Sequence, residues 1–119
     1  VPPPVAMQIV PPLLEAGKKV VDLSADFRLN SPDVYEKWYN CPHSAQHYLE
    51  EAVYGLPEIN RSDISSARLV ANPGCYPTSI ILGMAPLLKE GIVNSGSIML
   101  IQNPGPPGRG GGGGALSLV

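Results

Sequence analysis

The chain has 119 residues, of which 44% are hydrophobic and 15% are charged, and its formal net charge is −2. This length suffices for one ordinary domain but not for two, and the composition excludes a wholly disordered chain. Without surplus positive charge or an apolar run of roughly 18–20 residues, neither a nucleic acid nor a membrane is expected as a partner.

The two ends differ in composition from the middle of the chain. Five of the 14 prolines fall within the first 12 residues, and seven of the 13 glycines follow Pro104. Glycine-rich backbone loses much entropy on ordering and has no side chains to bury, so residues 102–119 are expected to form a flexible tail. The folded region is expected over 5–101. Because the chain begins without Met and closes on this tail, we expect it to be a piece of a longer protein.

A helix, a strand and a second helix are predicted in the first part of the chain. Apolar residues at helical spacing predict a helix over 5–16, and Gly17 is a suitable C-terminal stop. The β-branched run 19–23 predicts a buried strand, and residues 24–28 leave its carboxyl end as a loop. A serine followed by proline and aspartate is typical of a helix start, which places the second helix over 32–39.

The second part of the chain repeats this alternation. Residues 60–63 resemble a helix cap and predict a short helix near residue 65, and residues 68–71 predict a strand. A turn over 72–74 leads into an apolar helix, in which Pro86 is expected to cause a kink or a break. Residues 98–101 predict a third strand.

Alternating helices and strands predict an α/β fold with a mostly parallel sheet, and such sheets bind ligands at the carboxyl ends of their strands. The loops 24–28 and 72–78 both follow predicted strands, and the second contains Cys75 at a helix start. Free backbone N–H groups and the positive helix end favour a thiolate there and can receive an oxyanion. Position alone leaves two interpretations open for Cys75, a nucleophile or a buried structural cysteine.

Two other polar groups also admit more than one interpretation. Cys41, His43 and His47 have a spacing that can ligate zinc, but no fourth ligand is near, so an exposed polar segment is favoured and no metal site is expected. Asp22, Asp26 and Arg28, at the end of the first predicted strand and in the loop after it, could line a polar pocket or form an ion pair that shapes the loop.

Residues 70–78, Val-Ala-Asn-Pro-Gly-Cys-Tyr-Pro-Thr, resemble the active-site signature of the N-acetyl-gamma-glutamyl-phosphate reductases, which are semialdehyde dehydrogenases. Three further blocks match this family in the same order, at 21–29, 35–39 and 51–58. The resemblance covers about 5–101. Four ordered blocks are far more specific than one cysteine motif, and they favour the nucleophile interpretation of Cys75.

The resemblance implies part of a Rossmann-type NADP-binding domain leading into the start of an α/β catalytic domain. Residues 1–71 would be the later part of the NADP-binding domain, and residues 72–101 would open the catalytic and dimerisation domain. The family's glycine-rich dinucleotide fingerprint and catalytic histidine do not occur in this sequence.

The resemblance also implies a reaction. The Cys75 thiolate would attack N-acetyl-glutamyl 5-phosphate, a small acyl phosphate, and NADPH would reduce the resulting thioester to the semialdehyde of arginine biosynthesis. The residues implied to lie near substrate or cofactor are Ser24, Asp26, Arg28, Asn72 and Gly74. The full-length enzyme would be a homo-oligomer in the cytoplasm, or in a plastid if a transit peptide preceded this chain.

Two other functions remain open at this point. The chain could be a folded remnant of such an enzyme that has no catalytic activity by itself. It could also belong to a related aspartate or aminoadipate semialdehyde dehydrogenase, because the motif does not include the residues that choose the substrate.

Overall fold

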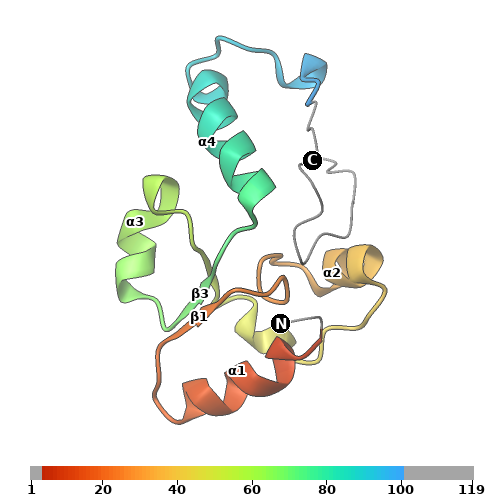
Figure 1. Ribbon diagram of the computed structural model, residues 1–119, viewed down its shortest axis with the longest axis vertical. Coiled ribbons are helices and arrows are strands. Elements are labelled where there is room, and N and C mark those ends of the chain that lie inside the picture. The colour runs from red at the N-terminus through yellow and green to blue at the C-terminus, as the bar shows by residue number, and fades with distance from the viewer. Residues whose placement is uncertain (1–3, 101–119) are drawn as a thin grey trace. The chain divides into compact units, whose positions relative to one another are not determined.

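The computed structural model describes residues 4–100, and the chain divides into two compact units between Pro86 and Leu87 (Figure 1). The first unit contains, in chain order, α1 (Ala6–Glu15), β1 (Val20–Asp22), α2 (Pro32–Tyr39), the 3-10 turn η1 (Gln46–Tyr48), β2 (Val53–Tyr54), α3 (Pro57–Ser66), β3 (Leu69–Ala71) and most of α4 (Cys75–Lys89). The second unit holds the end of α4 and the 3-10 turn η2 (Ser95–Ser97).

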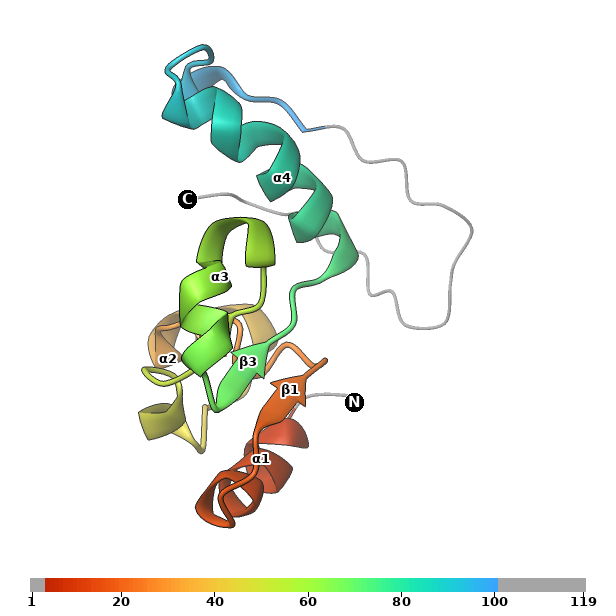
Figure 2. The ribbon, with the colours of Figure 1, turned by 90° about the vertical axis from the view of Figure 1, so that its left-hand side faces the viewer.

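The three strands form one parallel sheet in the order β1-β3-β2. Figure 2 shows β1 and β3 side by side and pointing the same way, and their register pairs Val20 with Leu69. Parallel neighbours need long connections, which α2 and α3 help to provide. The predicted α/β fold with a parallel sheet is therefore confirmed, and all three strands end at the same edge of the sheet.

The core lies between α1, one face of the sheet and the α2 region. Leu14 of α1 and Leu69 and Ala71 of β3 are buried in one cluster that also includes Phe27 and Tyr35. Burial of each large apolar side chain contributes roughly 1.5–3 kcal/mol. This cluster therefore supplies the main hydrophobic stabilisation of the first unit.

The other face of the sheet is more open than the sequence predicts. Residues 19–23 were expected to form a buried strand, but β1 lies at the sheet edge and Val21 is 64% exposed. Alternate side chains of a strand point to opposite faces, so Val20 packs against the core while Val21 faces away from it.

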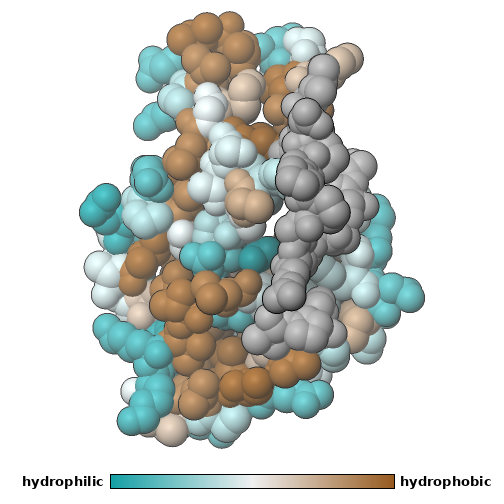
Figure 3. All heavy atoms as spheres, in the orientation of Figure 1, coloured by the Kyte–Doolittle hydropathy of each residue, from teal (hydrophilic) through white to brown (hydrophobic). Residues whose placement is uncertain are grey.

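Figure 3 shows apolar surface over the part of the molecule where α1 lies, and Ile9 and Leu13 of that helix are exposed.

Several local predictions are confirmed by the backbone. The Ser31 side chain accepts a hydrogen bond from the Val34 N–H, which caps α2 with Pro32 at its first position. Gly17 and Gly91 follow α1 and α4 with φ of +72° and +67°, as C-terminal stops require.

Three other predictions need correction. Strand β2 was missed because two residues are too few for a periodic pattern. The strand expected over 98–101 is absent from residues 98–100, which pair with none of the strands β1 to β3, and Ile101 lies outside the described residues. The break at Pro86 is absent, because α4 continues to Lys89, while the kink given as the other alternative stays a prediction.

The third helix begins earlier than the cap at 60–63 predicts. Pro57 starts α3, and Asn60 interrupts it with non-helical φ and ψ of −118° and 26°. The Asn60 side-chain amide donates to the Tyr54 carbonyl at 2.9 Å, so this residue holds the kink against the end of β2. The expected domain boundary between residues 71 and 72 stays a prediction, and residues 102–119 lie outside the described residues.

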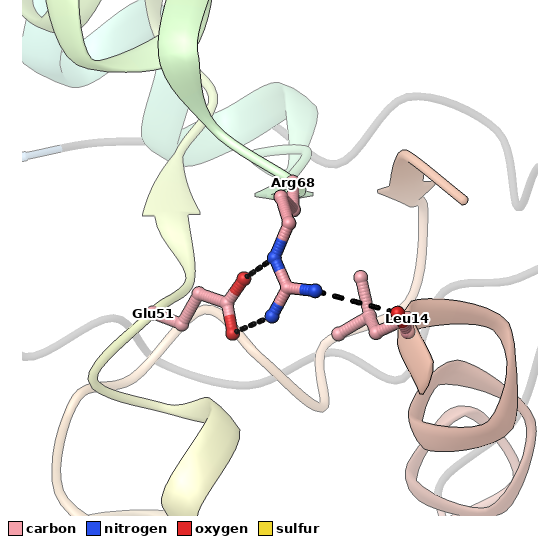
Figure 4. Close-up of polar contacts among 3 residues, drawn as sticks. All are labelled: Leu14, Glu51 and Arg68. Atoms are coloured by element: carbon pink, nitrogen blue, oxygen red, sulfur yellow. Dashed lines mark hydrogen bonds and ion pairs between the residues drawn. The ribbon is translucent and has the colours of Figure 1, made fainter. Parts of the chain in front are cut away.

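Arg68 connects three segments at the amino-terminal edge of the sheet (Figure 4). Arg68, just before β3, donates from Nε and Nη2 to the two Glu51 carboxylate oxygens at 2.6 and 2.8 Å. Its Nη1 donates to the Leu14 carbonyl near the end of α1 at 3.3 Å, where a cation complements the helix dipole. One side chain thereby joins three segments that are distant in the sequence.

Candidate active site

Three loops meet at the carboxyl edge of the sheet, one after each strand. The Asn72 N–H, just after β3, donates to the Asp22 carbonyl of β1 at 2.8 Å. The Gly55 N–H, just after β2, donates to the Ala71 carbonyl at 2.9 Å. These backbone bonds hold the loop starts together, as expected for the ligand-binding edge of a parallel sheet.

Gly55 is required at this edge by the closeness of β3. A Cβ atom at this position would lie 2.8 Å from Val70 Cγ1 and 3.2 Å from the Ala71 carbonyl oxygen. In the sequence, residue 55 was considered only as part of the matching block 51–58, so this contact was not predicted. The signal available was a glycine directly after a Val-Tyr pair, which is typical of close backbone approach.

Cys75 is the first residue of α4, and its thiol is free and exposed. The Gly74 carbonyl accepts the Thr78 N–H at 3.1 Å and the Thr78 hydroxyl at 2.8 Å, which closes the first helical turn. The Cys75 and Tyr76 N–H groups precede the first intrahelical donor, so they point to the helix entrance without a partner inside the helix. Among the described residues Cys75 is exposed, which favours the nucleophile over the buried structural cysteine, and its role stays a prediction.

Arg28 connects the loops after β1 and β3. Its Nε donates to the Asn72 carbonyl at 2.8 Å, and its Nη2 donates to the Leu23 carbonyl at 3.1 Å. A Cβ atom placed on Gly74 would lie 3.4 Å from Arg28 Nη1. The guanidinium therefore lies against the residue that precedes Cys75.

The alternative of an ion pair between Arg28 and Asp22 or Asp26 is wrong for the described residues, where the single arginine ion pair is that of Arg68. Arg28 is held by carbonyl dipoles, which orient its charge without neutralising it. Burial raises the pKa of the Tyr54 phenol, and the nearby positive charge of Arg28 opposes that rise. An uncompensated cation beside three strand ends is suited to bind an anion.

Ser24 and Asp26 lie inside the molecule rather than at this open edge. The Ser24 hydroxyl donates to Asp22 Oδ2 at 2.8 Å, and its oxygen accepts the Asp26 N–H at 3.1 Å. Asp26 is 0% exposed, and its carboxylate accepts the Ala6 N–H at 3.1 Å and the Tyr35 hydroxyl at 2.7 Å. Of the sequence-predicted residues, the structure thus brings Arg28 together with Asn72 and Gly74 beside Cys75, while Ser24 and Asp26 shape the loop.

The histidines considered as zinc ligands lie in different surroundings. His43 is 3% exposed; its Nε2 lies 2.7 Å from the Asp26 carbonyl oxygen, and its Nδ1 accepts the Ala45 N–H at 3.2 Å. His47 packs its ring against Tyr48. Over residues 4–100, no three histidine, cysteine or acidic side chains gather in a way that could hold a metal ion. The sequence missed the inward position of His43 because spacing does not report burial.

A dinucleotide cofactor would need a glycine-rich turn whose N–H groups meet the pyrophosphate. The turn after β1 is instead filled by the hydrogen bonds of Ser24 with Asp22 and Asp26. The turn after β3 leads to Cys75. The described residues therefore do not supply a pyrophosphate cradle.

No helix within residues 4–100 combines the length and the apolar character needed to cross a membrane.

Comparisons with known proteins agree on one family. A family model described as semialdehyde dehydrogenase, NAD binding domain, matches residues 1–67. The chain is 62% identical over 112 residues to the N-acetyl-gamma-glutamyl-phosphate reductase of Desulfotalea psychrophila, which covers 94% of this chain and 32% of that relative. It is 57% identical over 107 residues to the reductase of the same name from Geobacter metallireducens, covering 90% of the chain and 31% of the relative.

A third relative, the N-acetyl-gamma-glutamyl-phosphate reductase of Halorhodospira halophila, is 53% identical over 106 residues, covering 89% of the chain and 31% of the relative. The chain thus spans about a third of the length of the curated relatives that it matches. All three relatives are bacterial, so the alternative of a plastid enzyme gains no support.

Proposed function

The chain belongs to the semialdehyde dehydrogenase family, and from this membership we propose that it is part of an N-acetyl-gamma-glutamyl-phosphate reductase in which Cys75 is the nucleophile. The substrate would be an acyl phosphate, and the product would be its semialdehyde in arginine biosynthesis. The observation that carries the proposal is the exposed Cys75 thiol at the start of α4, with the cationic Arg28 beside the preceding residue.

Acylation of Cys75 is the first chemical step of this proposal. The thiolate sulfur forms a bond to the carbonyl carbon of the acyl phosphate, and the bond from that carbon to the phosphate oxygen breaks. Phosphate leaves with the electron pair, and a thioester remains on Cys75. Covalent capture divides one difficult reduction into two easier steps.

The surrounding groups suit the charges of this step. The Cys75 and Tyr76 N–H groups face the helix entrance, where negative charge develops on the carbonyl oxygen during attack. Arg28 has no carboxylate partner among residues 4–100, and its charge attracts the phosphate group before and after it leaves. Asn72 contributes through its backbone carbonyl, which holds Arg28 in place.

The family binds a nicotinamide cofactor, and we propose NADP(H), which supplies the hydride that converts the thioester to the aldehyde. Because the described residues lack a pyrophosphate cradle, the contribution of this chain is the thiol, the anion-binding arginine and the edge of the sheet. The complete enzyme is proposed to act as a homo-oligomer.

Trapping the acylated cysteine tests the proposal directly. The complete enzyme is incubated with N-acetyl-glutamyl 5-phosphate in the absence of NADPH, then digested and analysed by mass spectrometry. We expect an N-acetylglutamyl adduct on the peptide containing Cys75 and none on the peptide containing Cys41, whose thiol is half-buried. An enzyme that turns over substrate without acylating Cys75 would overturn the assignment.

The same experiment separates the remaining alternatives. A non-catalytic remnant would not be acylated by any acyl phosphate. A relative specific for aspartyl or aminoadipyl phosphate would be acylated by those compounds in preference. The identity of 51–62% to reductases of one name across the relatives favours N-acetyl-glutamyl 5-phosphate.

A further inference from the structure

The loop that contains Arg28 forms hydrogen bonds with α2 and with the segment that follows α2. We propose that Tyr35 and His43 are positioning residues, which fix Asp26 and thereby place Arg28 beside the Cys75 loop. This inference rests on the proposed function of Cys75 and Arg28. It assigns a role in the reaction to two residues that do not lie at the open edge of the sheet.

Asp26 is held by its side chain and by its main chain at once. Tyr35 donates its phenolic hydrogen to Asp26 Oδ1 at 2.7 Å, and the Ala6 N–H at the start of α1 donates to Oδ2 at 3.1 Å. The His43 Nε2 lies 2.7 Å from the Asp26 carbonyl oxygen. Both carboxylate oxygens and the backbone carbonyl therefore have fixed partners on other segments.

The hydrogen bonds of His43 determine which of its ring nitrogens carries the proton. Its Nδ1 accepts the Ala45 N–H at 3.2 Å, so the proton resides on Nε2, which donates to the Asp26 carbonyl. The ring meets Phe27 and Tyr35 edge-on, with centroid distances of 5.4 and 5.0 Å. His43 cannot turn away from Asp26 without losing two hydrogen bonds and these aromatic contacts.

Asp26 and Arg28 are two residues apart in the same loop, so the position of Asp26 determines where Arg28 can lie. The Arg28 N–H donates to the Ala25 carbonyl at 3.3 Å, and its guanidinium donates to the carbonyls of Leu23 and Asn72. Among the described residues, Nη1 is left without a hydrogen-bond partner, and it lies 3.4 Å from the Cβ position of Gly74. A displaced Asp26 would move this nitrogen relative to Cys75.

The chemistry of the network argues against a role in packing alone. A phenylalanine at position 35 would fill the same space. An apolar side chain at position 26 would avoid burying a carboxyl group that forms no ion pair within residues 4–100. Burial, reinforced by the hydrogen bond to Asp26, raises the pKa of the Tyr35 phenol, which keeps its hydrogen on the oxygen as a donor. These buried polar groups all converge on the loop of Arg28.

A double-mutant cycle in the complete enzyme tests this inference. Tyr35→Phe leaves Asp26 Oδ1 without its donor, and a misplacement near 1 Å is expected to lower kcat/KM by about 10- to 100-fold. In an Arg28→Met background the same change is expected to cost less than about twofold, because two residues that act through one group are not additive. Equal factors in both backgrounds would overturn the inference.

Tyr48→Phe is the matched control for the removal of a tyrosine hydroxyl. Tyr48 also donates to a carboxylate, Glu15 Oε1 at 3.3 Å, but near the Arg68 ion pair and not on the loop of Arg28. We expect Tyr48→Phe to change kcat/KM by less than about twofold, since its hydroxyl lies outside the network. A loss equal to that of Tyr35→Phe would show a general structural effect and would contradict the inference.

His43 supplies a second route if Tyr35→Phe does not fold. Glutamine can place an amide N–H near the position of Nε2 and keep the bond to the Asp26 carbonyl, whereas leucine cannot. We expect His43→Gln to retain kcat/KM within about threefold of the parent and His43→Leu to lose at least about tenfold. Equal losses in the two variants would count against positioning through this bond.

The proposed function fails in a different way from this inference. If Cys75→Ser retained full turnover, the nucleophile assignment would fall, whatever the network does. If Cys75→Ser were inactive but Tyr35→Phe and Arg28→Met were additive, the positioning inference alone would be wrong.

Discussion

Two arginines at opposite edges of the sheet show how the same side chain serves two purposes. Arg68, at the amino-terminal edge, binds both oxygens of the Glu51 carboxylate, and this contact raises the pKa of its guanidinium. Arg28, at the carboxyl edge, donates its guanidinium hydrogen bonds within residues 4–100 to the backbone carbonyls of Leu23 and Asn72. Among the described residues the charge of Arg68 is paired with a carboxylate and joins segments, whereas the charge of Arg28 has no carboxylate partner and is the one that we propose binds the phosphate.

The difference follows from the direction of the strands. In a parallel sheet the carboxyl ends share one edge, and the helices that follow present their positive ends there. Cys75 opens α4 at that edge, while Glu51 and Leu14 meet Arg68 at the other. The stabilising contact of Arg68 and the proposed chemistry of Cys75 therefore lie at opposite ends of the strands, and substitutions at the two edges should have different consequences.

The largest effect is expected for Cys75→Ser in the complete enzyme. Serine keeps the shape of the side chain, but its hydroxyl is a much poorer nucleophile, so turnover should fall at least about a thousandfold, or roughly 4 kcal/mol in the barrier. The melting temperature should barely change, because Cys75 is exposed. The measurement is phosphate-dependent oxidation of the semialdehyde, and Cys41→Ser is the control. More than about a tenth of parental turnover in Cys75→Ser would refute the assignment.

A paired substitution tests the contrast between the two edges. Arg28→Met should lower kcat/KM by about 10- to 100-fold, the value of one charge-assisted contact of roughly 1.5–3 kcal/mol. Arg68→Met should lower the melting temperature and change kcat/KM by less than about twofold, since it lies at the opposite edge. Steady-state kinetics and thermal unfolding of both variants make the comparison. Equal kinetic losses would remove the distinction between the edges.

The pH dependence of the free energy of unfolding tests the hydrogen bond between Tyr35 and Asp26. Burial, and then the hydrogen bond to Asp26, raise the pKa of Tyr35 in the folded protein. Its contribution to stability is fully present below the ordinary tyrosine pKa of about 10 and is lost as pH rises above it, because only the unfolded chain ionises readily there. Urea unfolding between about pH 9 and pH 11 should show a smaller decline for Tyr35→Phe than for the parent. The same decline in both would mean that Tyr35 does not titrate differently on folding.

The smallest effect is expected for binding of NADPH to this chain alone. The turn after β1 is occupied by its own hydrogen bonds, so no pyrophosphate cradle is available in residues 4–100. Isothermal titration calorimetry should detect no binding tighter than about 1 mM, which corresponds to roughly −4.1 kcal/mol. The complete enzyme is the positive control. Micromolar affinity of the chain alone for NADPH would contradict this prediction, because the chain would then contain a cofactor site.

Local signals predicted the elements that carry the site. The Ser31 cap, the glycine after α1 and the helix that begins beside Cys75 depend on neighbouring residues, and the structure confirms them. The parallel α/β fold followed from the alternation of such elements. These features are legible in sequence because caps, turns and amphipathic spacing arise within a few residues of chain.

Strand pairing between distant segments could not be predicted from such local signals. The two-residue strand β2 exists because Val53 pairs with Val70, and the strand expected over 98–101 is missing from residues 98–100. Position in the sheet also made β1 an edge strand and left Val21 exposed. A strand needs a partner, and the identity of that partner is a property of the whole fold.

The sequence by itself determined where the thiol stands, because a strand end, a tight turn and a helix start are all local. Only the tertiary structure decided that Arg28 reaches across to Asn72, 44 residues away, that Asp26 points inward to Tyr35, and that Arg68 takes the carboxylate. A long side chain can reach many candidate partners, and packing selects one of them. The physical reason is that burial makes each unmet hydrogen bond costly, so the fold as a whole chooses the partners.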